Sequence, residues 1–214
     1  SLYHDYAWRG FYRDAFGKQT VYLAAVDDDD RIRGVLPIVR QKSLLFGDYL
    51  VSVPFFNYGG TVADDDATRA SLVEAAGALA GRLGVQHLEL RETAAISDLP
   101  ARTDKVVMIL ALPETADELG KMLGSKRRSQ IRRPLRESPE VLRGGVDQLD
   151  TFYSVFSRNM RDLGTPVYAR RMFEDILRRF PDKCELLCVL VRGEPAAAAF
   201  LAHHGDTTEI PWAS

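Results

Sequence analysis

Apolar residues along the first half of the chain follow two spacings, one typical of helices and one typical of strands. Those of residues 5–16 fall on one face of a helix, which Gly17 ends. Two apolar runs, 21–26 and 32–39, flank an acidic turn at 27–30 and predict a β-hairpin. The remaining predicted elements of this half are strands over 49–56, 85–91 and 106–112 and a helix over 66–83.

The second half mixes the same two spacings. A helix is predicted from about residue 114, interrupted at Gly124, and two more helices over 150–160 and 171–180. Strands are predicted over 186–191, 196–202 and 207–212, with a turn at 193–195 between the first two.

The order helix, strand, polar turn, strand, strand therefore occurs twice, at residues 5–56 and again at 171–213. In the first copy a helix and two further strands follow, whereas in the second copy the chain ends at Ser214, where that helix would begin. We expect an α/β protein with mixed sheets, made of two superposable lobes over 1–112 and 113–214. The second lobe is expected to be incomplete at its C-terminus.

The composition, with 46% apolar and 27% charged residues, is ordinary for a globular protein in water. No apolar run approaches the roughly 20 residues of a membrane-spanning helix, and residues 1–5 contain no secretory apolar run. We therefore expect no transmembrane segment and a cytoplasmic protein, free or at the inner face of the membrane.

Charge is distributed unevenly around a net value of −2. Residues 1–120 carry 12 basic and 18 acidic side chains, whereas residues 121–214 carry 16 basic and 12 acidic ones. This asymmetry predicts an anionic partner for the second half.

The densest basic segment is 126–136, which has six basic residues and no acidic one. In a helix with Ser125 as its N-cap, these like charges would repel one another, and guanidinium groups suit phosphate or carboxylate. Pro134 should kink or end that helix. We expect Lys126, Arg127 and Arg132 to line a cleft between the lobes and bind an anion. The alternative is a solvated face that pairs with the acidic first half.

Two loops are further candidates for ligand contact. Gly164 and Pro166 end a helix and leave Asn159, Arg161 and Thr165 at its exit, where they could contact a ligand or form an ordinary C-cap. The loop Asn57-Tyr58-Gly59-Gly60 follows a strand, and its amides could hold an anion. A tight turn that needs positive φ explains its glycines equally well.

Other reactive groups form no recognisable site. Cys184 and Cys188 would lie about 13 Å apart on a strand, beyond disulfide reach, so we expect buried reduced thiols. Four scattered histidines predict no metal site. His87 is expected to pack or lie at a sheet edge, and His203 and His204 to face solvent. No catalytic triad can be assigned from spacing.

Seven segments, in order along nearly the whole chain, resemble the FemAB-like acetyltransferases of the GNAT superfamily, including members associated with exosortase and exopolysaccharide systems. They are 33–38, 45–47, 52–60, 87–91, 125–133, 159–166 and 209–214. The resemblance implies two GNAT-like lobes in tandem. It also implies transfer of an acyl or aminoacyl group onto an amine in the assembly of cell wall (peptidoglycan) or surface glycan. The long coiled-coil arm of some cell-wall members is missing.

The resemblance further implies an anionic acceptor that is nucleotide-, lipid- or glycan-linked. The donor would be acyl-CoA or aminoacyl-tRNA, with no tightly bound cofactor. The expected mechanism is positioning, with amides and arginines stabilising the oxyanion. Glu209 and Tyr168 are the candidates for a general base, and with Trp212 in the last segment they join the expected substrate-binding residues.

The donor site itself is not recognisable in the sequence. The segments 31–36 and 161–166 come nearest to the pyrophosphate-binding motif of CoA-dependent relatives, but each fails at the final small residue. We therefore expect these 214 residues not to bind acetyl-CoA appreciably. Two other classes stay open, a non-catalytic module that binds an anionic polysaccharide or lipid-linked precursor and a nucleic-acid binder with tRNA as partner.

Overall fold

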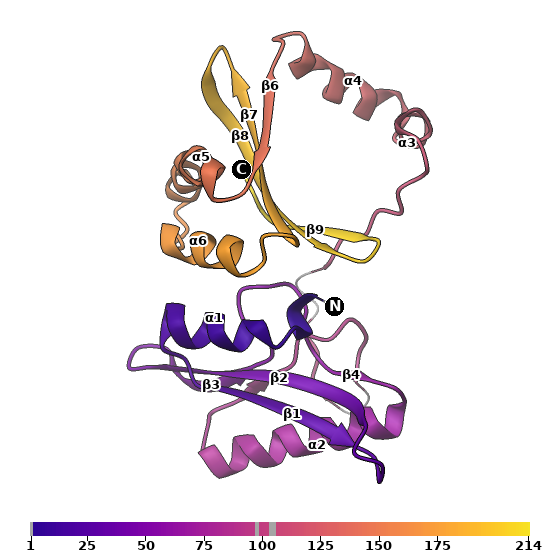
Figure 1. Ribbon diagram of the computed structural model, residues 1–214, viewed down its shortest axis with the longest axis vertical. Coiled ribbons are helices and arrows are strands. Elements are labelled where there is room, and N and C mark those ends of the chain that lie inside the picture. The colour runs from indigo at the N-terminus through magenta and orange to yellow at the C-terminus, as the bar shows by residue number, and fades with distance from the viewer. Residues whose placement is uncertain (1, 97–98, 103–105) are drawn as a thin grey trace. The chain divides into compact units, whose positions relative to one another are not determined.

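The computed structural model describes residues 2–96, 99–102 and 106–214. The chain forms two compact units, Ser1–Ala101 and Arg102–Ser214, each with its own sheet and helices (Figure 1). This confirms the mixed α/β class. The division falls at 101/102 rather than at the expected 112/113.

Unit 1 is a mixed sheet between two helical layers. Its elements are η1 (Leu2–His4), α1 (Ala7–Phe16), β1 (Thr20–Val26), β2 (Ile32–Ser43), β3 (Gly47–Val51), β4 (Val62–Ala63), α2 (Asp66–Leu83) and β5 (Leu88–Glu89). The strand order is β1-β2-β3-β5, with β4 beside β2. Strands β1 to β3 are antiparallel, and β5 runs parallel to β3.

The two faces of this sheet are covered by α1 and α2 (Figure 1). Helix α2 packs Leu72 and Ala76 against Leu36, Ile38 and other apolar residues of the sheet. It begins where the Asp65 carboxylate accepts the Thr68 amide at 2.7 Å, and it ends at Gly84, whose φ is 61°. The other face is aromatic, with Tyr3, Trp8, Phe11, Tyr12 and Phe56 in ring contact.

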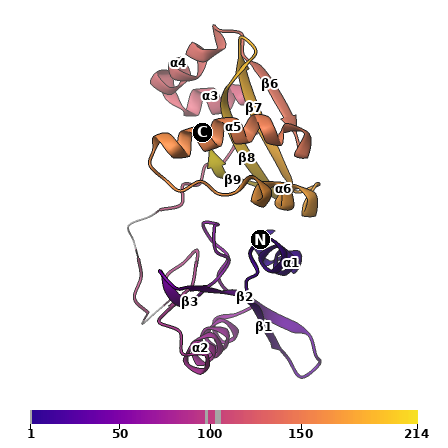
Figure 2. The same ribbon diagram turned by 90° about the vertical axis from the view of Figure 1, so that its left-hand side faces the viewer.

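Unit 2 has one antiparallel sheet. Its elements are α3 (Ala116–Met122), α4 (Gly124–Leu135), β6 (Glu140–Gly144), η2 (Val146–Gln148), α5 (Leu149–Asp162), α6 (Arg170–Arg179), β7 (Cys184–Val191), β8 (Glu194–His204) and β9 (Thr207–Ala213). The strand order is β6-β7-β8-β9. Helices α5 and α6 lie on one side of the sheet, and α3 and α4 lie on the other (Figures 1 and 2).

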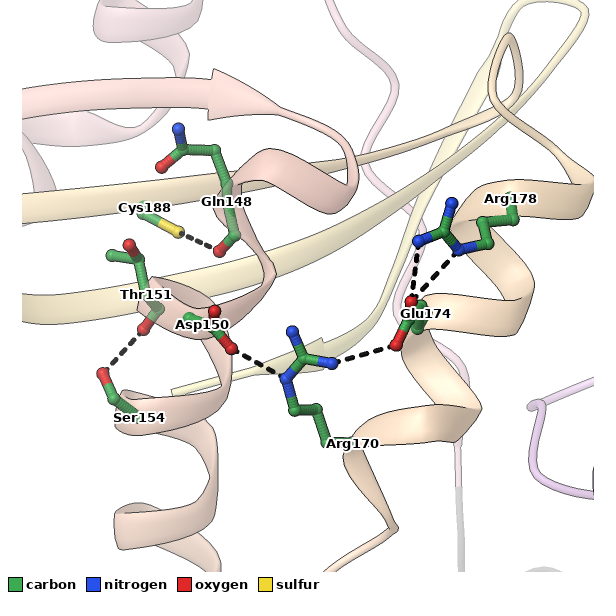
Figure 3. Close-up of polar contacts among 8 residues, drawn as sticks. All are labelled: Gln148, Asp150, Thr151, Ser154, Arg170, Glu174, Arg178 and Cys188. Carbon is green, nitrogen blue, oxygen red and sulfur yellow. Dashed lines mark hydrogen bonds and ion pairs between the residues drawn. The ribbon is translucent and has the colours of Figure 1, made fainter.

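Aromatic rings and ion pairs join α5 and α6 to each other and to the sheet. Phe152 of α5 and Phe173 of α6 contact each other at 5.1 Å between ring centroids, and both contact Phe200 of β8. At the surface, Arg170 donates to Asp150 of α5 at 2.7 Å and to Glu174 at 2.9 Å (Figure 3). These contacts fix the two helices on the sheet.

The repeated order of elements is present in the two units. Helix α1 precedes the antiparallel strands β1, β2 and β3, and α6 precedes the antiparallel strands β7, β8 and β9. Each first hairpin also carries a register shift close to its turn, at Ala25/Val26 and at Val189/Leu190. The strands within 18–56 and within 182–213 therefore follow one another in the same antiparallel order, and superposition of the two units stays a prediction.

Three predicted elements differ from the structure. The segment 106–112 is not a strand, because no neighbouring strand pairs with it, and Met108 and Ile109 are 87% and 89% exposed. The strand predicted over 49–56 ends at Val51, and the one over 85–91 is reduced to Leu88–Glu89. The two short strands β4 and β6 were not predicted.

Ser125 is not the N-cap of the basic helix. Only Leu123, which has helical backbone angles, separates α3 from α4, and α4 begins at Gly124 with a φ of 73°. An N-cap needs an extended residue ahead of the helix, and none is available here. Pro134 lies one residue before the end of α4, which agrees with its predicted effect.

None of the helices described in the structure is long and apolar enough to cross a membrane.

Candidate functional site

Helix α4 presents the basic segment almost entirely to solvent. None of its residues is buried, and Lys126, Arg127 and Arg132 are exposed. Arg128 Nη1 donates to the Gly120 carbonyl of α3 at 3.3 Å. Arg128 thus holds α4 against α3, and its neighbours stay available to a ligand.

The basic side chains of α4 differ from several other arginines of unit 2 in whether they contact a carboxylate. Several arginines elsewhere in this unit contact a carboxylate: Arg143, Arg161, Arg170, Arg178, Arg179 and Arg192. In the described part of the chain, Lys126, Arg127 and Arg132 have no such partner. Like charges one turn apart on a helix repel each other, so an anion bound there would relieve the repulsion.

In the loop Asn57-Tyr58-Gly59-Gly60, the two glycine amides are already bonded within unit 1. The amides of Gly59 and Gly60 both donate to the Arg91 carbonyl, at 3.1 and 2.9 Å. In this conformation the amides of Gly59 and Gly60 are engaged within unit 1, and the anion site at this loop stays a prediction. Asn57 is exposed, and the Tyr58 ring meets Tyr3 edge-on at 5.4 Å.

The two glycines have steric reasons to be glycines. Gly59 has a φ of 154°, and a Cβ there would lie 2.5 Å from the Val53 side chain. A Cβ on Gly60 would lie 2.4 Å from the Glu92 carboxylate. The need for positive φ thus explains Gly59, whereas at Gly60 the close approach is to the Glu92 side chain.

The exit of α5 forms a C-cap. Gly164, with a φ of 65°, donates its amide to Arg161, and the Thr165 amide donates to Met160 at 2.9 Å. The Arg161 guanidinium contacts its neighbour Asp162 at 2.9 Å. Thr165 is exposed. The Asn159 side chain makes a contact distant in sequence, because its Nδ2 donates to Ser214 Oγ, just after β9, at 3.1 Å.

Trp212 is part of the core of unit 2. It is 8% exposed, and its ring lies 5.2 Å from the rings of Phe173 and Phe200. Tyr168 meets it edge-on at 6.2 Å, and the Tyr168 carbonyl accepts the Tyr153 hydroxyl at 3.0 Å. A role of Trp212 in direct ligand contact is thus less well supported than a packing role.

Glu209 lies on β9 opposite Ala202, half-buried, next to the register shift between β8 and β9. The structure therefore brings Asn159, Tyr168 and Trp212 together near the end of β9, apart from the exposed charges of α4. The residues of the Asn57–Gly60 loop belong to unit 1. That the basic residues of α4 line a cleft between the lobes remains a prediction.

One feature of unit 1 was missed by the sequence patterns. Val53 and Phe55 have φ values of 47° and 80°, in a region that β-branched and bulky residues rarely adopt. The surrounding structure holds them there: Arg91 Nη1 donates to the Phe56 carbonyl, and the Tyr12 hydroxyl donates to the Pro54 carbonyl at 2.8 Å. Burial raises the pKa of Tyr12, so this hydroxyl keeps its proton.

Glu92 completes this arrangement. Its side chain is 8% exposed, and its Oε1 accepts the amide and the hydroxyl of Thr61 at 2.7 and 2.8 Å. Arg69 approaches Oε2 at 3.3 Å. Strained backbone with this support is typical of functional loops. No spacing pattern in the sequence indicates it, because the partners lie about 35 residues apart in the chain.

His4 Nε2 lies 2.6 Å from the Gly60 carbonyl, whereas His87, His203 and the two cysteines fall outside these clusters. His87 stacks on Tyr49 at 4.7 Å, as expected for a packed or edge residue. His203 does not simply face solvent, because its ring contacts Glu185 at 3.0 Å and Thr208 at 2.9 Å. Both cysteines are free and buried, as expected. Among the described residues, no group of three or more His, Cys, Asp or Glu could hold a metal ion.

Two comparisons with known proteins bear on this arrangement. Residues 125–214, which include α4 from its second residue and the whole sheet of unit 2, match the family of acetyltransferase (GNAT) domains. The crystal structure of FemX matches 100% of this chain and is itself covered to 75%, with a TM-score of 0.65 and 13% sequence identity. At this identity the likeness concerns the fold. No curated protein sequence gave a match.

The family match places a GNAT domain in unit 2, and the FemX fold extends over both units. Acyl transfer is thus the general activity that the chain's second unit supports. Residues 125–214 are thus similar to acetyltransferase (GNAT) domains, and the whole chain resembles FemX in fold, which agrees with the ordered motifs of the sequence.

Proposed function

We propose that the protein transfers an acyl or aminoacyl group onto an amine of an anionic acceptor, such as a precursor of the cell wall or of a surface glycan. The observation that carries this proposal is the set of unpartnered basic side chains on α4, within the segment that matches the acetyltransferase domain. A phosphate or carboxylate on the acceptor would compensate these charges. Such a reaction fits a cytoplasmic protein or one at the inner face of the membrane.

The reaction would proceed by nucleophilic attack of the acceptor amine on a thioester or ester carbonyl of the donor. The new C–N bond forms, the C–S or C–O bond breaks, and the amine proton passes to a base or to water. The protein's part is chiefly to hold the acceptor so that its amine meets the carbonyl. Glu209 and Tyr168 remain the candidates for the base, since both are half-buried in unit 2.

The donor is proposed to be acyl-CoA or aminoacyl-tRNA, taken up for each turnover and not bound tightly. We further propose that these 214 residues do not bind acetyl-CoA appreciably. The engagement of the Gly59 and Gly60 amides by Arg91 supports this, because it removes the glycine-rich donors of unit 1. Calorimetry that measures micromolar acetyl-CoA binding to this chain would overturn that part of the proposal.

Transfer is tested by incubating the full-length protein with a panel of acyl-CoAs and aminoacyl-tRNAs and a panel of amine acceptors. Mass spectrometry then detects the acylated amine. The rival function, a module that only binds an anionic polysaccharide or lipid-linked precursor, predicts acceptor binding without product.

A nucleic-acid partner is tested separately. Binding of tRNA through the α4 charges would weaken steeply as salt rises, with a slope set by the number of phosphates contacted. Uncharged tRNA that binds as well as aminoacyl-tRNA, with no product, would favour a nucleic-acid binder over a transferase.

A further inference from the structure

The turn between β2 and β3 exposes three consecutive large apolar side chains. Leu44 is fully exposed, and Leu45 and Phe46 are 87% and 77% exposed. Single apolar residues on a surface are common, but a run of three at the tip of a hairpin needs an explanation. Neither the GNAT match, which begins at residue 125, nor the proposed acceptor site on α4 involves this tip.

Several contacts hold the backbone of this turn in place. Ser43 and Gly47 face each other across the turn, and Gly47 has a φ of 88°. A Cβ on Gly47 would lie 1.9 Å from Gln86 Oε1, so the turn packs tightly against the segment before β5. At the base, Arg40 and Asp48 form a two-pronged ion pair at 2.8 and 2.6 Å.

The backbone of the tip is suited to an apolar environment. Ser43 Oγ accepts the amides of Leu45 and Phe46 at 3.2 and 3.4 Å. These two donors therefore have a partner when water is removed, which matters because an unsatisfied amide is costly in lipid. The Lys42 side chain, 73% exposed, stands beside the tip, where it could meet anionic headgroups.

From these observations we propose that Leu44, Leu45 and Phe46 insert into the interfacial layer of a phospholipid bilayer and hold unit 1 at the membrane surface. A protein partner fits the tip less well, because a stable protein interface buries about 800 Å² on each side, far more than a convex turn of three residues offers. A bilayer needs no matching surface, and its affinity grows with the apolar area inserted. The proposal does not depend on acyl transfer.

The test replaces Phe46 with Trp and measures fluorescence with vesicles of phosphatidylcholine containing a minor fraction of phosphatidylglycerol. The native Trp8 and Trp212 are buried and provide a constant background. We expect a blue shift on binding and quenching by brominated lipid chains. In co-sedimentation, L44S/L45S/F46S should bind these vesicles about tenfold or more weakly, because three apolar side chains no longer enter the lipid.

The matched control is V26S/I32S, which removes two exposed apolar side chains that pair at the end of the β1–β2 hairpin. It should bind vesicles like the wild type. Circular dichroism checks that the variants fold. Wild-type protein that does not sediment with vesicles, or a triple variant that sediments equally well, would overturn the proposal. A dimer in sedimentation velocity that only the triple variant loses would assign the tip to a second copy of the chain instead.

Discussion

Burial determines the chemistry of the two cysteine side chains. Cys184 and Cys188 face the core of unit 2, where their relative exposures are 3% and 0%. Desolvation raises the pKa of Cys184 to about 12 and also raises that of Cys188. Thiols rather than thiolates are therefore present at neutral and mildly alkaline pH.

We predict that neither cysteine reacts with Ellman's reagent in the folded protein at pH 8. Both should react at once in concentrated urea, because unfolding exposes the sulfurs and restores an ordinary pKa. The absorbance of the released thiolate measures this. Rapid labelling of the folded protein, with its circular dichroism unchanged, would contradict the burial described here.

Glu174 lies between Arg170 and Arg178 and forms an ion pair with each (Figure 3). Its contribution to folding stability therefore depends on pH. The hydrogen bond from Arg178, with the charges of both arginines, lowers the pKa of Glu174 below its usual value. Stability from this group is fully present above the pKa of the unfolded chain. It is lost as the pH falls through the lower pKa of the folded protein.

Glu174→Gln should therefore lower the melting temperature slightly at pH 7, and the difference from the wild type should disappear in strong acid. Thermal melts at several pH values measure it. Because Asp162 pairs with Arg161 at the exposed end of α5, Asp162→Asn is a suitable control for removal of one surface carboxylate. A difference that grows as the pH falls would contradict the lowered pKa.

Single residues show where sequence patterns stop being informative. The sequence identifies Gly59 and Gly60 as turn residues or anion ligands, and only the structure shows that their amides bond the Arg91 carbonyl. Trp212 belongs to a motif of the resembled family, yet three aromatic rings surround it. Partners distant in sequence determine the role of such residues, and no local spacing reveals them.

Helices and strands are predicted well where their apolar residues recur at a regular spacing and capping residues mark their ends. Helix α2 spans 66–83 as predicted, because Asp65 caps its start and Gly84 its end. The strand predicted over 106–112 is wrong, because a strand also needs a neighbouring strand to pair with, and the apolar run does not specify one. Strand β6 (Glu140–Gly144) is missed because two of its five residues are charged, and only its pairing with β7 identifies it.

At the scale of helices and strands, the testable prediction concerns the basic helix α4. R127E/R132E should weaken binding of a nucleotide sugar, with UDP-N-acetylglucosamine as the probe, by about tenfold or more, because two charge-assisted contacts are lost. The melting temperature should hardly change, since α4 buries no side chain. Calorimetry and thermal melts provide the two readouts.

R31E/R192E is the matched control, because it changes the net charge by the same amount at exposed arginines outside α4. It should bind the probe like the wild type. A large loss of stability in R127E/R132E with unaltered binding would instead support a structural role for the basic helix.

For the whole molecule, the repeated order of elements and the ordered set of motifs were sufficient to predict the fold. Each motif is short, but their sequence along the chain agrees with the GNAT match in unit 2 and with the FemX fold. The donor and acceptor could not be predicted, because they depend on how side chains from separate elements meet. The prediction that the two units superpose on each other can be tested by an experimental structure.

The central claim, acyl transfer onto an amine of an anionic acceptor held by α4, is tested most directly by steady-state kinetics. The full-length protein and its R127E/R132E variant are compared on two amine acceptors that differ only in a phosphate group, with the acylated product quantified by mass spectrometry. We predict that the wild type and the variant both form the acylated product. For the phosphorylated acceptor, the variant should have a KM raised about tenfold or more with a similar kcat. The reason is that the lost contacts hold the acceptor equally in the ground state and in the transition state. Binding of the acceptor without product from any donor, or a KM that the substitutions leave unchanged, would contradict the account.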